Sequence, residues 1–427
     1  MRYDYLVTAP LGIYVHFPWC ERRCPYCDFN TYVPGEGDGA GAAVPAPHGP
    51  PHRAYADAVL RELHARAPRE AAGRTLRTIY FGGGTPGMWE PAELGRVVAG
   101  ARDLFARIGT VALEEVTVES NPASSQEDRF RAFVAAGADR FSIGCQSFDD
   151  DTLRALGRLH SGAQARDATR AARAAGARRV SLDLMFGCPA QTPASFTRDL
   201  AAAVACAPDH LSAYGLTIEP GTPFAEWRAA GRLALPDEDA AADMLDDALA
   251  TLAEAGYERY EISNWALPGA RAVHNTGYWL GWEYLGLGAG AHSFRRDGPA
   301  AHRRVNALRP AAYLAAPDRA ADDSGPEPAQ APLGPRGLAD RRALDAPVAY
   351  RVAPETLWRE ALLAGLRLAE GLDLAAFAAA YAHDLATASA RPIARARDRG
   401  LVALDAGRLR LTDRGFLFAD EVIASFL

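Results

Sequence analysis

The chain has 427 residues, of which 49% are hydrophobic and 23% are charged, and this suits one large domain plus a smaller one. The formal net charge is −7 and the basic residues are all arginine, so charge gives no reason to expect binding to nucleic acid. No apolar run is long enough for a signal peptide or a membrane span, and we therefore expect a cytoplasmic protein.

The first half of the chain alternates short β-rich runs with amphipathic helical patterns. The helical pattern that follows the third β-rich run would open with a capping box formed by Ser124 and Glu127. The clearest helical stripe consists of Leu94, Val97, Val98, Ala101, Leu104, Phe105 and Ile108. Successive β-then-α units predict an α/β fold with a parallel sheet and right-handed crossovers. The strands are expected at residues 12–17, 78–81, 114–119, 140–146, 179–186 and 210–217.

The phase of these strands distinguishes an open sheet from a barrel. In the strand over residues 114–119 the two valines share one face, while Thr117 and Glu119 share the other. The next two strands follow the same rule, and their polar faces end at Gln146 and Asp183. An open doubly wound sheet would bury both faces and favour continuous apolar runs. We therefore predict a partial (β/α)6 barrel with a polar lumen and a site at its C-terminal rim.

Two segments rich in Gly, Pro and Ala, residues 33–52 and 316–337, have little to bury and are expected to be mobile surface loops. We divide the chain into a barrel over residues 1–314, a linker over 315–350 and a C-terminal domain over 351–427. In that last domain, helical patterns precede two short strands and an apolar closing helix, which predicts a winged-helix-like module. Its ten arginines balance ten acidic residues, so its charge does not favour DNA binding.

Three cysteines, Cys20, Cys24 and Cys27, form a CxxxCxxC motif directly after the first strand. In a reducing compartment such a cluster binds metal more often than it forms disulfides. Zinc would need a fourth ligand, for which His16 is near in sequence, whereas a cubane cluster can take three thiolates and leave one iron open. We favour the cluster, with zinc and unligated thiols as alternatives. The remaining cysteines are interpreted as buried small hydrophobes, namely Cys145, Cys188 and Cys206.

The segment FGGGTP, residues 81–86, ends the second predicted strand. Its glycines would let backbone N–H groups approach a ligand closely, and Thr85 adds a hydroxyl. The segment has neither the lysine of a phosphate loop nor the GxGxxG spacing of a dinucleotide fold. Taken alone it is a tight turn, but beside an open iron it becomes a candidate cradle for a carboxylate or amino group.

Six segments in order resemble a known family: YVHFPWCERRCPYC, FGGGTP, VES, SIGCQSF, SLDLMFGCPAQT and GLGAGAHS. They are similar to the radical S-adenosylmethionine (SAM) family that contains oxygen-independent coproporphyrinogen III oxidase and the HemW-type heme chaperones. The resemblance covers nearly all of the chain except the two Gly/Pro-rich segments. It implies that Cys20, Cys24 and Cys27 hold a 4Fe-4S cluster whose fourth iron binds S-adenosylmethionine. It also implies that the residues around this cofactor are Tyr14, Tyr26, Gly83, Gly84, Thr85, Glu119, Gln146, Arg158, Asp183 and Thr217.

Two departures from the oxidase pattern decide between its branches. The oxidase motif continues to a fourth cysteine, whereas this chain has Phe29 there, as the HemW-type pattern does. HNTGYW, residues 274–279, fits the heme-binding signature HNxxYW of the chaperones, which implies that His274, Asn275 and Tyr278 contact heme. A histidine imidazole is a competent axial ligand for heme iron, although an isolated loop histidine is more often hydrogen-bonded to its neighbours. His292, near the last rim loop, is a weaker candidate for contact with cofactor or heme.

The resemblance therefore implies a heme chaperone that binds heme and passes it to apo-proteins such as respiratory cytochromes. The alternatives are coproporphyrinogen III dehydrogenation by radical oxidative decarboxylation, and a radical enzyme that acts on heme itself. We expect no nucleic-acid partner. We also consider transient contact with a membrane surface, and a homodimer.

Overall fold

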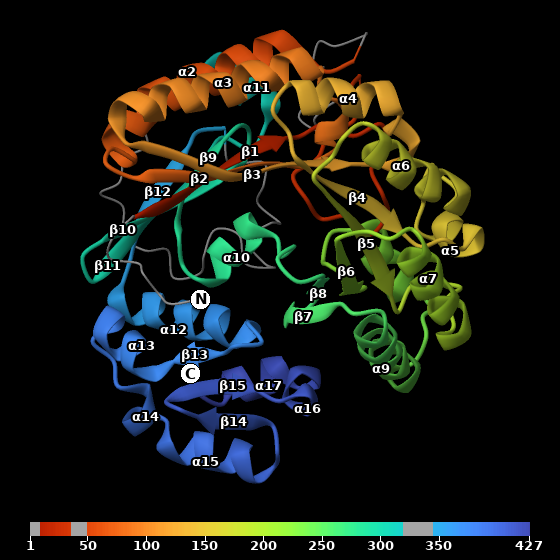
Figure 1. Cartoon of the computed structure of the whole chain (residues 1–427), viewed down its shortest axis with the longest axis vertical. Helices are drawn as coiled ribbons and strands as arrows, with labels where there is room; N and C mark the ends of the chain where they lie inside the picture. Colours follow the sequence, from red (N-terminus) through yellow and green to blue (C-terminus); the bar gives the residue numbers. More distant parts are fainter. Residues whose placement is uncertain (1–8, 36–48, 319–344) are drawn as a thin grey trace.

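The computed structural model describes residues 9–35, 49–318 and 345–427, so most of the two Gly/Pro-rich segments lies outside the described residues. Its centre is a run of six parallel strands that confirms the predicted β/α units (Figure 1). These strands are β1 (Pro10–Phe17), β2 (Thr75–Gly83), β3 (Thr110–Ser120), β4 (Arg140–Gln146), β5 (Arg179–Phe186) and β6 (His210–Gly215).

Helices cover the outer face of these curved strands (Figure 1). The predicted apolar stripe of α3 is buried from Leu94 to Phe105, and Pro91 at the first turn suits the start of that helix. Burying this stripe against the sheet removes several large apolar side chains from water, which is the main source of stability in such a layer. The covering helices are α2 (His52–Glu70), α3 (Pro91–Ile108), α4 (Glu127–Ala135), α5 (Asp150–Ala155), α6 (Gly162–Ala174) and α7 (Pro193–Ala205).

The predicted capping box at the start of α4 is wrong. Pro122 opens a short 3-10 turn, η2 (Pro122–Ser124), and the Ser124 hydroxyl donates to the Asn121 carbonyl instead of capping the helix. The N-cap of α4 is Gln126, whose side chain accepts no capping hydrogen bond. A proline two residues before the serine therefore redirected the chain into a different turn.

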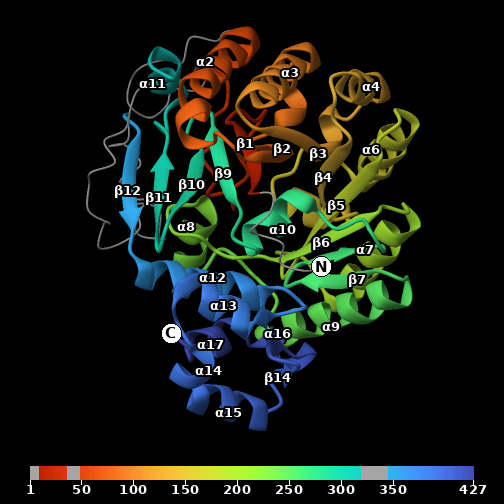
Figure 2. The same ribbon diagram turned by 60° about the vertical axis from the view of Figure 1, so that its left-hand side comes forward.

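Further strands extend the sheet on both sides to twelve strands, in the order β12-β11-β10-β9-β1-β2-β3-β4-β5-β6-β8-β7. The two ends of this order do not pair with each other in the described structure, so the sheet is the predicted partial barrel. Segment 348–352, placed across the linker boundary by sequence, is a strand of this sheet and pairs with β11 (Figure 2). The added strands are β7 (Glu258–Glu261), β8 (Asn264–Ala266), β9 (Glu283–Leu287), β10 (His292–Asp297), β11 (Ala300–Val305) and β12 (Val348–Val352). The helices in this region are α8 (Pro223–Ala229), α9 (Glu238–Glu254), α10 (Val273–Trp279) and α11 (Pro310–Ala315).

The C-terminal module packs around a separate apolar core and carries a three-stranded sheet beside its helices. It is joined to the barrel by the Ala369 N–H, which donates to the Tyr260 carbonyl (2.9 Å), and by a bridge between Glu261 and Leu368. No helix in the described ranges is both long and apolar enough to cross a membrane. The elements of the C-terminal module are α12 (Pro354–Arg367), β13 (Leu372–Asp373), α13 (Leu374–Tyr381), α14 (Leu385–Ala388), α15 (Ala390–Asp398), β14 (Val402–Asp405), β15 (Arg408–Leu411), α16 (Asp413–Leu417) and α17 (Ala419–Ala424).

Candidate functional site

Two cavities meet near the C-terminal ends of the parallel strands. The first, the rim cavity, has a volume of about 430 Å³ and is lined by the cysteine loop and by residues at the ends of β2 to β6. The second, the aromatic cavity, has a volume of about 670 Å³ and lies between β9–β11 and the helices α12 and α13 of the C-terminal module. Both cavities are lined by a shared wall that consists of Asp28, Phe29, Gly83 and Glu119.

The three motif cysteines lie in the loop that follows β1, and all three line the rim cavity. The Thr85 hydroxyl donates to the Cys20 sulfur (3.4 Å), and the Arg158 guanidinium donates to the Cys24 sulfur (3.6 Å). Burial raises the pKa of the Cys20 thiol to about 12, and it also raises the pKa of Cys27. Such thiols ionise only beside a strong positive charge, which the irons of a cluster supply. Three soft donors on one cavity wall fit an iron–sulfur cluster.

The glycines of FGGGTP bring the exits of β1 and β2 close together. Gly83 has φ +113°, and a Cβ built on it would lie 2.5 Å from the His16 ring, so no larger residue fits. The Gly83 N–H donates to the Glu119 carboxylate (3.1 Å) and the Gly84 N–H donates to the Phe17 carbonyl (2.8 Å). These N–H groups, which the sequence interpretation assigned to a ligand, are bonded within the protein. The glycines line the rim cavity as a close-packed turn.

Two buried carboxylates face the lumen, as the phase of the strands predicts. Glu119 accepts hydrogen bonds from the Tyr80 hydroxyl (2.7 Å) and from the N–H of Gly83 at the end of β2 (3.1 Å). Asp183 accepts from the hydroxyls of Ser142 (3.0 Å) and Ser212 (2.8 Å). Burial raises the pKa of both carboxyls, and that of Glu119 reaches about 7. These two carboxylates therefore favour a ligand that carries positive charge and hydroxyl groups that can donate hydrogen bonds.

Arginines supply the opposite charge in the same cavity. Arg158 donates to the Asn121 side chain and to the Gly144 carbonyl, both at 2.8 Å. Its Nε and two nitrogens of Arg140 are buried without a hydrogen-bond partner, and both residues line the rim cavity. Buried guanidinium groups are normally satisfied, so these unused donors fit a ligand that brings a carboxylate or other acceptor oxygens. The cavity therefore suits a zwitterionic ligand such as S-adenosylmethionine.

β4 ends in an unusual backbone conformation. Gln146 has φ +64°, which is uncommon for a residue other than glycine, and the pairing with β5 is irregular between Ile143 and Gln146. An irregularity of this kind re-aims a side chain at the end of a strand. It turns Gln146 to the rim cavity, where strain of this sort is commonly found at functional sites.

Most of the predicted site residues meet at one place. Tyr14 and Tyr278 line the aromatic cavity instead, and His274 lines neither cavity. The rim cavity is lined by Cys20, Cys24, Tyr26, Cys27, Gly83, Gly84, Thr85, Glu119, Gln146, Arg158, Asp183, Thr217 and Asn275. Among the polar lining residues that were not predicted from sequence are Asn121, Arg140, Ser142 and Ser212. The two serines share the polar faces of their strands, and that alternation could have identified them.

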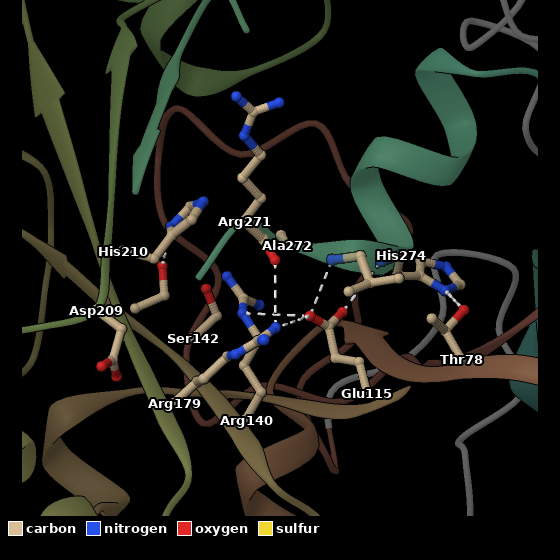
Figure 3. Close-up of polar contacts among 12 residues, drawn as sticks. Thr78, Glu115, Arg140, Ser142, Arg179, Asp209, His210, Arg271, Ala272 and His274 are labelled. Carbon is tan, nitrogen blue, oxygen red and sulfur yellow. Dashed lines mark hydrogen bonds and ion pairs between the residues drawn. The ribbon is translucent and has the colours of Figure 1, made fainter. Parts of the chain in front are cut away.

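HNTGYW forms α10, which lies inside the curve of the sheet rather than at its rim (Figure 1). Glu115, in the middle of β3, accepts hydrogen bonds from the backbone N–H groups of Val273 (3.0 Å) and His274 (3.1 Å). The guanidinium groups of Arg140 and Arg179 lie 3.8 and 4.0 Å from the same carboxylate (Figure 3). A buried carboxylate paired with arginine thus anchors the start of α10 to the floor of the barrel.

The His274 side chain is only 3% exposed and has both ring nitrogens in hydrogen bonds. Nδ1 pairs with the Thr78 hydroxyl (2.7 Å), toward which the ring points in Figure 3, and Nε2 pairs with the Tyr278 hydroxyl (2.9 Å). The ring also stacks on Tyr80, with centroids 5.0 Å apart. Burial and the charge of Arg140 lower its pKa to about 3, so the ring is neutral. In this arrangement His274 offers no free nitrogen to an iron.

Comparison with known proteins places the chain in a family. Residues 14–202 match the model of the radical SAM superfamily, and residues 352–418 match that of the HemN C-terminal domain. The heme chaperone HemW of Mycobacterium tuberculosis is 35% identical over 418 residues, which cover 98% of this chain and 95% of that protein. The chain belongs to the HemW family of radical SAM proteins. This membership confirms the branch that Phe29 and HNTGYW predict.

Other HemW relatives and one solved structure agree. The heme chaperone HemW of Escherichia coli is 39% identical over 284 residues, 66% of this chain and 70% of that protein. Coproporphyrinogen III oxidase (HemN) from Escherichia coli, a radical SAM enzyme, has a TM-score of 0.74 at 23% identity, over 99% of this chain and 91% of that one. HemN and this HemW family member therefore share a fold.

Proposed function

We propose that this chain binds heme and passes it to apo-proteins such as respiratory cytochromes. The relatives named heme chaperones support this function. The observation that carries it is the aromatic cavity beside the CxxxCxxC loop. Its volume of about 670 Å³ lies in the range of small-molecule sites, and its walls are rich in aromatic side chains, as a flat apolar macrocycle requires.

In this proposal Cys20, Cys24 and Cys27 hold a 4Fe-4S cluster, which supplies an open iron and a source of electrons. Arg158 orients the carboxylate of S-adenosylmethionine with its Nε–H, the donor that the protein leaves unused. The carboxylates of Glu119 and Asp183 accept hydrogen bonds from the polar groups of S-adenosylmethionine. The other predicted contacts complete the lining of the rim cavity and include Tyr26, Gln146 and Thr217. Tyr14 would act from the aromatic side of Glu119, since both residues line that cavity.

The test is an anaerobic titration of the purified, cluster-reconstituted protein with hemin, followed by addition of a heme-free cytochrome. We expect a new Soret band at micromolar hemin, and its replacement by the spectrum of the loaded cytochrome. A protein whose hemin spectrum stays that of free hemin would contradict the proposal.

The same sample tests the two alternatives. Conversion of coproporphyrinogen III in the presence of S-adenosylmethionine and a reductant would show the oxidase activity that Phe29 argues against. Formation of S-adenosylhomocysteine or methylthioadenosine with heme would indicate a radical enzyme that modifies heme. We expect neither product. Contact with a membrane surface and a homodimer stay predictions.

A further inference from the structure

We propose that heme binds in the aromatic cavity with His292 as its iron ligand and with Arg296 and Arg303 at its propionates. The proposal rests on the proposed function, because it assigns the residues that hold the cargo. It differs from the expectation based on HNTGYW, in which His274 is the ligand.

The residues concerned share one face of one hairpin. His292, Phe294 and Arg296 alternate along β10, so their side chains point to the same side of the sheet. Arg303 of β11 lies directly opposite Phe294 in the register, which places it on that side too. All four line the aromatic cavity, and β9, β10 and β11 lie side by side in Figure 2. One imidazole, one aromatic ring and two guanidinium groups therefore face a common space.

Of the two histidines that line the aromatic cavity, His292 is the one with a ring free to bind a metal. The Nε2–H of His16 donates to the Asn30 carbonyl while its Nδ1 pairs with the Tyr14 hydroxyl, so both of its ring nitrogens are engaged. The Nε2–H of His160 donates to the Cys145 carbonyl, and this histidine lines the rim cavity and not the aromatic one. His274 has both ring nitrogens engaged. In the described part of the chain the half-buried ring of His292 has no hydrogen-bond partner. Burial and nearby positive charge lower its pKa to about 4, which keeps it neutral, as iron ligation requires.

The two arginines have spare capacity for carboxylates. The Arg303 guanidinium pairs with Glu360 (2.7 Å), yet its Nε is buried without a hydrogen-bond partner. The Arg296 guanidinium lies over the Tyr381 ring, 5.1 Å from its centre, and in the described ranges no carboxylate lies within ion-pair distance of it. Arginine is the preferred partner of carboxylates because its planar fork can donate two parallel hydrogen bonds. Two such groups at one edge of the cavity match the two propionates of heme.

Aromatic side chains complete the cavity, and they give HNTGYW a different role. Tyr278 and Trp279 from α10 line it together with Tyr284 of β9, and the indole N–H of Trp279 is buried without a partner. The His274 ring is hydrogen-bonded to the Tyr278 hydroxyl, and it thereby fixes the position of Tyr278 in the lining of the aromatic cavity. His274 is therefore a positioning residue for the cavity, while His292 contacts the iron.

The test compares the hemin spectra of three variants of the full-length protein. We expect His292→Ala to lose the Soret band of imidazole-ligated heme and to bind hemin about tenfold more weakly or worse, and added imidazole to restore the band. His292→Cys should give a thiolate-type spectrum, which a purely structural role would not produce. His302→Ala is the matched control, because this histidine of the neighbouring strand pairs with Asp297 and does not line the cavity.

His274→Ala distinguishes this proposal from the expectation that His274 of HNTGYW is the iron ligand. We expect it to weaken binding while it keeps the imidazole-type spectrum. If His274→Ala loses that spectrum and His292→Ala keeps it, the ligand assignment is wrong although the protein binds heme. If the wild type binds no hemin, the proposed function fails, and this inference fails with it.

The propionate contacts are tested with hemin dimethyl ester, whose propionates carry no charge. The wild-type protein should bind the ester at least about tenfold more weakly than it binds hemin. The double variant Arg296→Gln/Arg303→Gln should bind hemin as weakly as the wild type binds the ester. In the double variant the difference between the two ligands should vanish. An undiminished preference for hemin in the double variant would overturn the role of these arginines.

Discussion

Glu119 belongs to the wall between the two cavities, and its buried carboxyl has a pKa of about 7 instead of its ordinary 4.5. Between these two values the folded protein binds more protons than the unfolded chain, so the free energy of unfolding falls as pH rises through this window. For a fully buried carboxyl this amounts to up to about 3 kcal/mol. A ligand with positive charge beside Glu119 would offset this cost.

Glu119→Gln removes this titration and keeps the size of the side chain. We expect the free energy of unfolding of the wild type, measured by urea denaturation without added ligand, to fall between pH 5 and pH 8 relative to the variant by about 1–3 kcal/mol. Parallel pH profiles for the two proteins would show that Glu119 titrates normally.

Cys24 tests the cluster at the same scale. Cys24→Ala leaves two thiolates for four irons, so we expect a near-complete loss of the cluster's absorbance after reconstitution, together with iron and sulfide content close to background. Cys206→Ala is the control, because this half-buried cysteine lies outside the motif. A variant at Cys24 that kept a full cluster would mean that another residue supplies the third ligand.

At the scale of elements, α10 depends on one carboxylate. Glu115 is fully buried, it accepts two backbone N–H groups at the start of α10, and it neutralises Arg140. Glu115→Ala would leave a buried guanidinium without its partner, and we expect a loss of about 3–5 kcal/mol in urea denaturation. Glu114, next to Glu115 on β3, is exposed and pairs with the partly exposed Arg77 of β2, so Glu114→Ala should cost less than about 1 kcal/mol. Equal losses in the two variants would exclude this anchoring role.

The sequence was sufficient for the parallel strands and for the lumen, because the alternation that turns Glu119 and Asp183 inward is local. It did not predict that HNTGYW would lie on the floor of the barrel, since that position depends on Glu115, more than a hundred residues earlier in the chain. On β10 the sequence pointed to His292 as a weaker candidate, and the contribution of Phe294 and Arg296 to the aromatic cavity was missed. The run HSFRRD contains only one large apolar residue and is typical of an exposed hairpin, and it becomes a cavity wall only when α12 covers it.

At the scale of the whole molecule, β12 is the strand that brings the C-terminal module over β10 and β11. It pairs with β11 and leads directly into α12, whose Leu357, Glu360 and Ala361 line the aromatic cavity. The cavity is thus built from barrel and module together. The HemN C-terminal domain match begins at residue 352, where that strand ends.

Because the two cavities share a wall, binding at one should change binding at the other. We expect S-adenosylmethionine to change the apparent Kd for hemin several-fold, and hemin to change that for S-adenosylmethionine by the same factor, since such coupling is reciprocal. Phe29→Ala should reduce the coupling with little loss of stability, because this side chain is 63% exposed. Identical hemin titrations with and without S-adenosylmethionine would show that the cavities are independent.

Asp28 and Phe29 connect the cysteine loop to the aromatic cavity. Both directly follow the last motif cysteine, so the loop that would hold the cluster also supplies part of the aromatic cavity. Oxidative destruction of the cluster would free that loop and open the cavity at the same moment. Under the proposed function, loss of the cluster would therefore weaken heme binding, and reconstitution of the cluster would restore it.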